Sequence, residues 1–220
     1  MNKRTSTYVA ALLIVVAALG VVVGRQTGPS PTTTTIVAQP SAAVWPFATG
    51  PMRFTDPSTA AYSFAVNYVG FNRPIVGTFQ RGDARSGEVP VRATANGPVT
   101  TVLVRQFGAD NTWWVLGAVS AAIEVTSPKV LAAVSSPMAL SGRSSAFEAI
   151  VNVDLRGDAS LVSVARTTVR GGSMGVMGPF AKSLRFSSPS APAGALMLRT
   201  FSAKDGSVVE ANVLRVFFAH

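Results

Sequence analysis

Ser173 has the sequence spacing of a hydrolase nucleophile. The run Gly171–Gly175 (GGSMG) has the spacing of a nucleophile elbow, and Asp205 and His220 follow in the order of a Ser–Asp–His triad. Such a serine needs a strand before it and a helix after it, whereas Gly178–Pro179 disfavours a helix here. His220 is also the last residue, and chain ends order poorly. We therefore expect a flexible glycine loop and no catalytic residue, with an esterase-like hydrolase using Ser173 as the alternative.

The numbers of cysteine and histidine residues exclude several kinds of metal and redox site. The chain has no cysteine and one histidine, which excludes disulfides, thiolate zinc sites and multi-histidine metal sites. Asp154 and Asp158 suggest a calcium loop, but Arg156 lies between them and too few oxygen ligands follow. Glu148 has no positioned partner for acid–base catalysis, and we expect it to pair with a surface arginine. We expect no cofactor and no metal ion.

Two Arg-Gly-Asp tripeptides are present, Arg81–Gly82–Asp83 and Arg156–Gly157–Asp158. On a tight turn this tripeptide can serve as an adhesion ligand. Glycine and aspartate are also common turn residues in their own right. We expect both tripeptides to lie in hairpin loops and to be structural.

Trp113 and Trp114 are adjacent, so a strand through them places one ring on each face of a sheet. One ring is expected in the core. The other packs on the linker or the second domain, or else is exposed as a stacking platform for sugar rings in a carbohydrate-binding module. The chain has no nucleotide-binding loop and no run of interleaved basic and aromatic residues, so we expect no nucleic-acid partner.

Basic residues are concentrated in the C-terminal part of the chain. The net charge is +9, and residues 126–220 hold ten basic and five acidic residues, whereas residues 56–125 are neutral. Arg166 and Arg170 share one face of a predicted strand, and Lys182 follows the glycine loop. The three form a predicted cationic edge that attracts anionic wall polymer or lipid head groups. The alternative is that they are scattered solubilising charges.

The first 24 residues have the pattern of a membrane anchor. An apolar run without charges, Tyr8–Gly24, follows two basic residues, and its length is at the short end of what spans a bilayer. The excess of positive charge before the run predicts a cytoplasmic N-terminus. A cleaved signal peptide with its site at Ala18–Gly20 is the alternative, although the apolar run continues through Val21–Val23. We expect residues 1–24 to be a retained signal-anchor.

A linker and a small mixed domain follow. Residues 25–55 are rich in proline and threonine and predict an extended spacer, in which Trp45 packs on the next domain or lies at the membrane surface. Residues 56–121 predict a small α+β domain, with a helix that begins at Asp56–Pro57 and ends at Gly70. Its strands are expected over Ile75–Gln80, Val89–Ala93, Val99–Phe107 and Thr112–Val119.

Residues 122–220 have the pattern of strands alone. Seven short strands are expected over Ala122–Val125, Met138–Ser141, Phe147–Leu155, Leu161–Val169, Phe180–Phe186, Ala195–Phe201 and Val208–Phe218. Along the third of these strands, apolar residues such as Phe147 alternate with Glu148 and Asp154, which predicts that Phe147 is buried and the acids point to solvent. Seven strands in this length predict an immunoglobulin-like β-sandwich with a core of its own.

Short motifs follow one another in a fixed order along this segment. They are Ser127–Pro128, Ser136–Pro137, Gly142, Phe147–Glu148, Pro179–Phe180 and Asp205–Gly206–Ser207. In this order they resemble the immunoglobulin-like domain of bacterial spore-germination proteins. The resemblance implies an extracytoplasmic, noncatalytic accessory module joined to another domain behind an anchor. It carries over no catalytic or metal-binding residue and does not imply a role in germination.

The expected protein is mainly β, with an N-terminal transmembrane helix, a small α+β domain and a C-terminal immunoglobulin-like β-sandwich. We expect it to be a single-pass protein of the cell membrane, with its folded domains outside the cytoplasm. Its expected partners are the membrane and either an envelope protein or an anionic wall polymer. The candidate binding residues are Arg166, Arg170, Lys182, Trp113 and Trp114.

Overall fold

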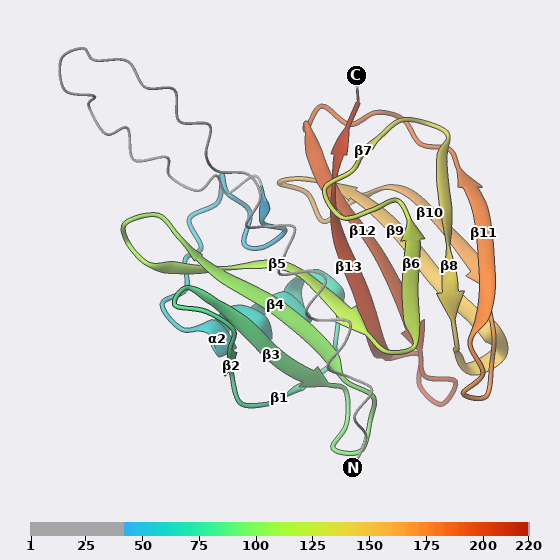
Figure 1. Cartoon of the computed structure of the whole chain (residues 1–220), viewed down its shortest axis with the longest axis horizontal. Coiled ribbons are helices and arrows are strands. Elements are labelled where there is room, and N and C mark those ends of the chain that lie inside the picture. The colour runs from blue at the N-terminus through green and yellow to red at the C-terminus, as the bar shows by residue number, and fades with distance from the viewer. Residues whose placement is uncertain (1–41, 220) are drawn as a thin grey trace, which may run out of the picture. The chain divides into compact units, whose positions relative to one another are not determined.

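The structure, a computed structural model, describes residues 42–219 (Figure 1). The predicted anchor, the first part of the predicted linker and His220 lie outside the described residues. No helix within the described range is long and apolar enough to cross a membrane. The hydrophobic clusters of the described chain are built from residues 42–218, within the compact unit Val37–His220. A chain that begins at Val37 therefore keeps every core contact reported below.

One long helical segment precedes the strands. Helix α2 (Pro57–Ser63) continues as the π-helix η2 (Phe64–Val69). Asp56 caps its start by accepting a hydrogen bond from the Thr59 amide at 2.7 Å. Gly70 ends it with a left-handed φ of 96°, a conformation that glycine adopts without strain. The helix predicted between Asp56 and Gly70 is confirmed.

Thirteen strands and the short 3-10 turn η3 follow the helix in the part of the chain that the structure describes. They are β1 (Ile75–Val76), β2 (Gln80–Arg81), β3 (Ser86–Arg92), β4 (Thr100–Phe107), β5 (Thr112–Ser120), β6 (Ile123–Ser127), β7 (Ala133–Val134), β8 (Met138–Ser144), η3 (Phe147–Ala149), β9 (Ile150–Gly157), β10 (Ser163–Arg170), β11 (Gly178–Leu184), β12 (Ala193–Phe201) and β13 (Val208–Phe218). The main path of pairing is β1-β3-β4-β5-β13-β12-β9-β10. The single strand predicted over Ile75–Gln80 is wrong, because β1 and β2 are two short strands that each pair with β3.

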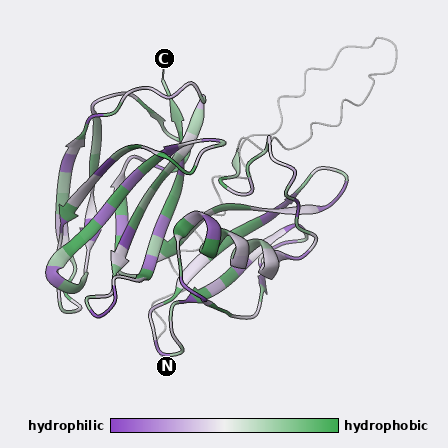
Figure 2. Cartoon of the chain, turned by 180° about the vertical axis from the view of Figure 1, so that it is seen from behind, coloured by the Kyte–Doolittle hydropathy of each residue, from purple (hydrophilic) through white to green (hydrophobic). Residues whose placement is uncertain are grey.

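The C-terminal strands form two layers, as predicted for a sandwich (Figure 1). Strands β13, β12, β9 and β10 make one layer, and β6, β8 and β11 make the other. Hydrophobic and hydrophilic residues alternate along several of these strands (Figure 2), and the hydrophobic side chains of the two layers meet between them. The mainly β fold class is therefore confirmed.

The N-terminal part does not have a core separate from the sandwich. Its helix packs against β3, β4 and β5, and residues of β12 and β13 belong to the same hydrophobic cluster as the helix. In β12, Ala195 and Met197 belong to the helix-side core, while Leu196 and Leu198 belong to the sandwich core. Because β12 is buried on both faces, the two parts share a strand and form one folded unit.

Residues 42–55, which were predicted to be part of the linker, belong to the folded unit. Trp45 and Phe54 are buried, and the Val115 amide donates a hydrogen bond to the Trp45 carbonyl at 2.7 Å. The Trp45 indole also donates to the Ser63 hydroxyl at 3.2 Å, which attaches this segment to the helix. The prolines of residues 25–55 predicted an extended spacer, but the side chains of Trp45 and Phe54 belong to the helix-side core.

Candidate functional site

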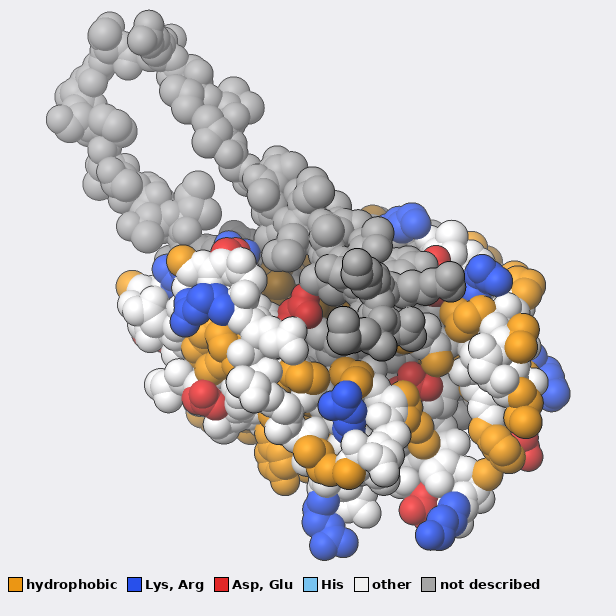
Figure 3. All heavy atoms as spheres, turned by 60° about the horizontal axis from the view of Figure 1, so that its bottom comes forward, with side chains coloured by type: hydrophobic (Ala, Val, Ile, Leu, Met, Phe, Trp, Pro, Cys, Tyr) orange, Lys and Arg blue, Asp and Glu red, His pale blue; other side chains and the backbone are white. Residues whose placement is uncertain are grey.

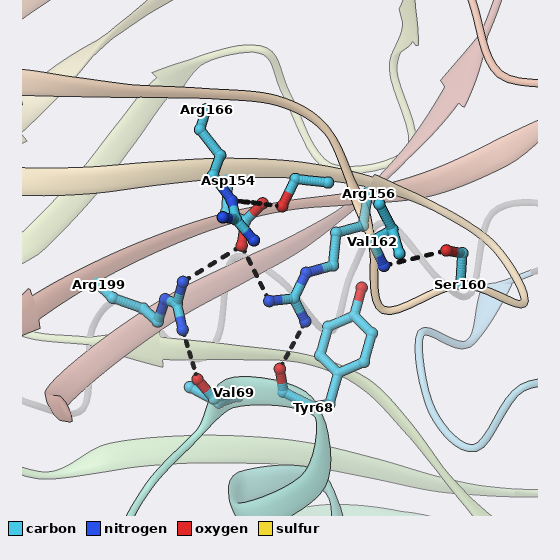
Figure 4. A network of polar contacts seen from close by, with 9 residues as sticks. Tyr68, Val69, Asp154, Arg156, Ser160, Val162, Arg166 and Arg199 are labelled. Carbon is cyan, nitrogen blue, oxygen red and sulfur yellow. Dashed lines mark hydrogen bonds and ion pairs between the residues drawn. The ribbon is translucent and has the colours of Figure 1, made fainter. Parts of the chain in front are cut away.

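Asp154 is buried where the helix meets the sandwich, with 2% of its surface exposed. Its oxygen Oδ2 accepts hydrogen bonds from Arg156 at 2.9 Å and from Arg199 at 3.2 Å (Figure 4). Arg166 approaches the other oxygen, Oδ1, to 3.8 Å from the solvent side. The Asp154 carboxylate is thus surrounded by the guanidinium groups of three arginines. We call Asp154, Arg156, Arg166 and Arg199 the charge cluster.

Two of these arginines, the buried Arg156 and the partly buried Arg199, also bind the end of the helix. Arg156 donates a hydrogen bond to the Tyr68 carbonyl at 2.7 Å, and Arg199 donates one to the Val69 carbonyl at 2.8 Å (Figure 4). These carbonyls lie at the C-terminus of η2, where unpaired carbonyl groups and the helix dipole favour cations. The charge cluster therefore ties the helix to β9 and β12.

The Tyr68 ring completes this junction. The Arg156 guanidinium lies 5.1 Å from the ring centroid, and Phe64 stacks on Tyr68 at 5.4 Å. Burial raises the pKa of the Tyr68 hydroxyl well above its ordinary value, against the opposing effect of Arg156. The Tyr68 hydroxyl therefore stays neutral in this buried junction.

The sequence analysis was wrong about the direction in which the Asp154 and Arg156 side chains point. Alternation along β9 placed Asp154 toward solvent, and Arg156 was expected in a hairpin loop. Both are buried, because the outer face of this sandwich layer is covered by the helix. The available signal was a pair of opposite charges two residues apart in an otherwise apolar strand, a spacing that puts both side chains on one face.

The second carboxylate of the suspected calcium loop is also bound to an arginine. Arg215, which is 1% exposed, donates to both oxygens of Asp158, with one of the two hydrogen bonds at 2.6 Å. Asp154 and Asp158 thus each have guanidinium partners and do not converge on one point for a cation. Within residues 42–219, no group of three or more His, Cys, Asp or Glu side chains could hold a metal ion.

The two Arg-Gly-Asp tripeptides differ in their settings. Arg81 ends β2, its guanidinium donates to the Ala84 carbonyl at 3.2 Å, and Asp83 accepts from the Arg85 amide at 2.7 Å, so this tripeptide forms a turn closed on itself. Residues 156–158 instead begin inside β9 with a buried arginine. The second tripeptide therefore lies at the end of β9, and only its Asp158 lies in the predicted hairpin loop that leads to β10.

Ser173 does not lie in a nucleophile elbow. It lies in the loop 171–177 between β10 and β11, so a strand and not a helix follows it. Asp205 accepts hydrogen bonds from the amide and hydroxyl of Ser207 in its own turn, at 3.1 and 2.7 Å. The third member of the predicted triad, His220, is outside the described residues. The described residues thus do not assemble a triad.

Neither ring of the Trp113–Trp114 pair is a stacking platform. Trp113 is 5% exposed and packs against Phe79 at 5.2 Å in the helix-side core. Trp114 is 4% exposed, lies in a small cluster with Ala43, and has the Arg53 guanidinium 5.0 Å over its ring. Trp114 therefore packs on residues 42–53, which were predicted to be part of the linker. The alternative prediction, an exposed ring that stacks on sugars, is wrong.

The predicted cationic edge is present as an arrangement of exposed side chains. Arg166, Thr168 and Arg170 occupy alternate positions on β10 and are all exposed. Lys182 on β11 donates a hydrogen bond to the Thr168 carbonyl at 3.1 Å, which places its charge at the same edge of the sandwich. Whether this edge binds an anion remains a prediction.

A hydrophobic surface that the sequence did not reveal lies at one end of the sandwich. Phe147, predicted to be buried in a strand, is 60% exposed in the turn η3, where Glu148 has a left-handed φ of 58°. Met174 and Val176 in the loop 171–177 are 85% and 70% exposed. The sequence predicted Phe147 to be buried because apolar and polar residues keep alternating through η3 into β9.

A hollow of about 370 Å³ lies at this end of the sandwich. Its lining consists of Ala121, Ala122, Ser145, Ala146, Phe147, Met174, Gly175 and Met177. Figure 3 brings the lower end of the molecule in Figure 1 forward, and hydrophobic side chains are interspersed there with basic ones. Most of these lining residues are small or apolar, and Ser145 carries the one hydroxyl group among them.

The sandwich geometry agrees with a comparison to known families. Residues 122–207 match the family model described as the immunoglobulin-like domain of bacterial spore germination. No curated protein and no solved structure matches the chain. The resemblance derived from the ordered motifs is thereby confirmed.

The immunoglobulin-like domain extends beyond the matched segment in this chain. Strand β13 begins at Val208, directly after the match ends, and pairs with β12 along its length. Val216 in β13 is fully buried in the sandwich core. Strand β13, which pairs with β5 of the N-terminal part, thus lies outside the matched residues, whereas β12 lies within them.

Proposed function

We propose that the protein is a membrane-anchored accessory protein that acts outside the cytoplasm by binding and not by catalysis. The immunoglobulin-like match supports an accessory or interaction role. One observation carries the proposal: the buried Asp154 and the partly exposed Asp158 are both bound by arginines that hold the fold together. The exposed side chains of the sandwich are basic at the edge of β10 and β11 and apolar in the loop 171–177, which suits binding to a partner.

The two rival functions lack support in the geometry. An esterase-like hydrolase would need Ser173 before a helix, and a strand follows it instead. A carbohydrate-binding module would need an exposed aromatic platform, and Trp113 and Trp114 are both buried. Binding of an anionic wall polymer then depends on the cationic edge formed by Arg166, Arg170 and Lys182 alone.

Surface labelling of intact cells tests this topology. The chain has no native cysteine, so single cysteines can be introduced into the full chain as Thr5→Cys and Val162→Cys. Val162 is 74% exposed in the loop between β9 and β10, and its cysteine should react with a membrane-impermeant maleimide from outside. The Thr5→Cys variant should react only after the cells are permeabilised.

The opposite pattern of labelling would overturn the proposed orientation. Recovery from the medium of a protein that begins near Val21 would overturn the anchor and restore the cleaved signal peptide. Fractionation of the same labelled cells separates these two results.

A further inference from the structure

The hydrophobic surface at the end of the sandwich is formed by two neighbouring segments. The Ala146 amide donates to the Gly172 carbonyl at 3.1 Å, and the Gly171 amide donates to the Ala149 carbonyl at 3.0 Å. These hydrogen bonds fasten the loop 171–177 to the turn that carries Phe147. Single exposed hydrophobic residues are ordinary on a protein surface, but here Phe147, Met174 and Val176 are gathered at one tip.

The loop presents these side chains from a fixed support. The Gly172 amide donates to the Ser144 carbonyl at 2.8 Å, and Val176 closes a turn onto the Ser173 carbonyl at 2.9 Å. Gly175 within this turn has a φ of 81°, which other residues adopt only with strain. Holding the tip in one conformation reduces the entropy cost of inserting it into another phase.

Basic side chains surround the tip. Arg170 directly precedes the loop, and the Arg143 guanidinium donates to the Met177 carbonyl within it at 3.1 Å. Lys182 lies near Arg170 through its hydrogen bond to the Thr168 carbonyl. Residues 171–180 contain no acid, and Glu148 is the acid beside Phe147. The surface thus combines an apolar tip with a basic margin.

We propose that this tip, formed by Phe147, Met174 and Val176, inserts into the interface of an anionic phospholipid bilayer. Arg143, Arg170 and Lys182 then contact the lipid phosphates around it. Apolar residues beside bases are the pattern of segments that lie in a membrane interface. A hydrophilic wall polymer would match the charges but would leave the methionine and valine in water.

The inference rests on the proposed function, because an anchored protein holds the sandwich next to a membrane. Its test is separate, because the fragment 37–220 lacks the predicted anchor and keeps the described core. Vesicle binding by this fragment reports on the loop, whereas surface labelling of the full chain reports on the anchor.

Fluorescent probes on single cysteines test the insertion directly. An environment-sensitive fluorophore on the Met174→Cys variant should shift to the blue with vesicles of phosphatidylglycerol and phosphatidylcholine. The matched control is Val162→Cys, an exposed apolar site of similar exposure at the other end of β10. The eight residues of β10 separate the two sites by about 25 Å, so the control probe should not shift.

Sedimentation with the same vesicles measures each contribution. Met174→Ser combined with Val176→Ser should lower the partition coefficient by about tenfold, because these side chains lose their apolar transfer. Arg170→Ala should lower it by about fivefold on anionic vesicles and leave it unchanged on phosphatidylcholine alone. Arg185→Ala, an exposed base beyond the other end of β11, is the charge control and should have no effect.

Three results would overturn the proposal. They are an unshifted probe at Met174, equal shifts at both probe sites, and partition that is unchanged in the double serine variant. Retention on cell-wall fragments without retention on vesicles would assign the basic margin to wall polymer instead.

Discussion

Replacing Asp154 with asparagine should lower the free energy of unfolding by about 3–5 kcal/mol. Asparagine keeps the shape of the side chain but removes the charge that Arg156 and Arg199 share. The guanidinium groups of the buried Arg156 and the partly buried Arg199 then lose their counter-ion, with 8% and 17% of their side-chain surfaces exposed. The loss also loosens the two hydrogen bonds that these arginines donate to the end of the helix.

Urea denaturation of the fragment 37–220 measures this change. The matched control is Asp205→Asn, an acid in the exposed hairpin turn between β12 and β13, which should change stability little. Combining Asp154→Asn with Arg199→Met should cost less than the separate effects added together, because the two residues share one interaction. Equal effects of the Asp154 and Asp205 substitutions would contradict the structural role of the charge cluster.

Local sequence signals predicted the elements of the fold well. Asp56, Pro57 and Gly70 marked the helix because capping and helix-ending conformations depend on residues within a few positions. Most strands were also predicted from alternation, which reflects burial of one face. β7 (Ala133–Val134) was missed because two residues carry no detectable period.

The predictions failed where a second layer changed what a face contacts. Met197 and Asp154 lie on the outer face of the sandwich, which the alternation pattern treats as solvated. The helix that covers this face comes from far away in the sequence, so no local window contains the information. Arg166 and Arg170 were placed correctly because β10 lies at the end of the pairing order, where this outer face is uncovered.

Met197→Ala should destabilise the protein by about 2–5 kcal/mol, because Met197 is fully buried and belongs to the core between β12 and the helix. The substitution leaves a cavity at the surface where the two parts meet. The resulting loss should move the unfolding of both parts together, since each part packs on this strand. Thermal and urea denaturation of the fragment 37–220 measure the change.

Met174→Ala is the matched control, because Met174 is the same residue type at 85% exposure. Its stability should remain close to that of the parent fragment. A loss at Met197 no larger than the loss at Met174 would show that the helix does not pack on β12.

The shared core has a consequence for function. Because β12 and β13 contact both the helix and the sandwich interior, the N-terminal part cannot hinge freely about the sandwich. The basic edge and the hydrophobic tip are therefore carried by one rigid unit. An anchor attached to its N-terminal side would restrain the whole unit and not the first part alone.

Unfolding of the two parts must coincide if they form one unit. All three tryptophans, Trp45, Trp113 and Trp114, lie in the N-terminal part, whereas most strands lie in the sandwich. Urea unfolding of the fragment 37–220 followed by tryptophan fluorescence and by far-ultraviolet circular dichroism should give superimposable transitions with one midpoint. Two separate midpoints, with the tryptophan signal lost while the strand signal persists, would contradict a shared core.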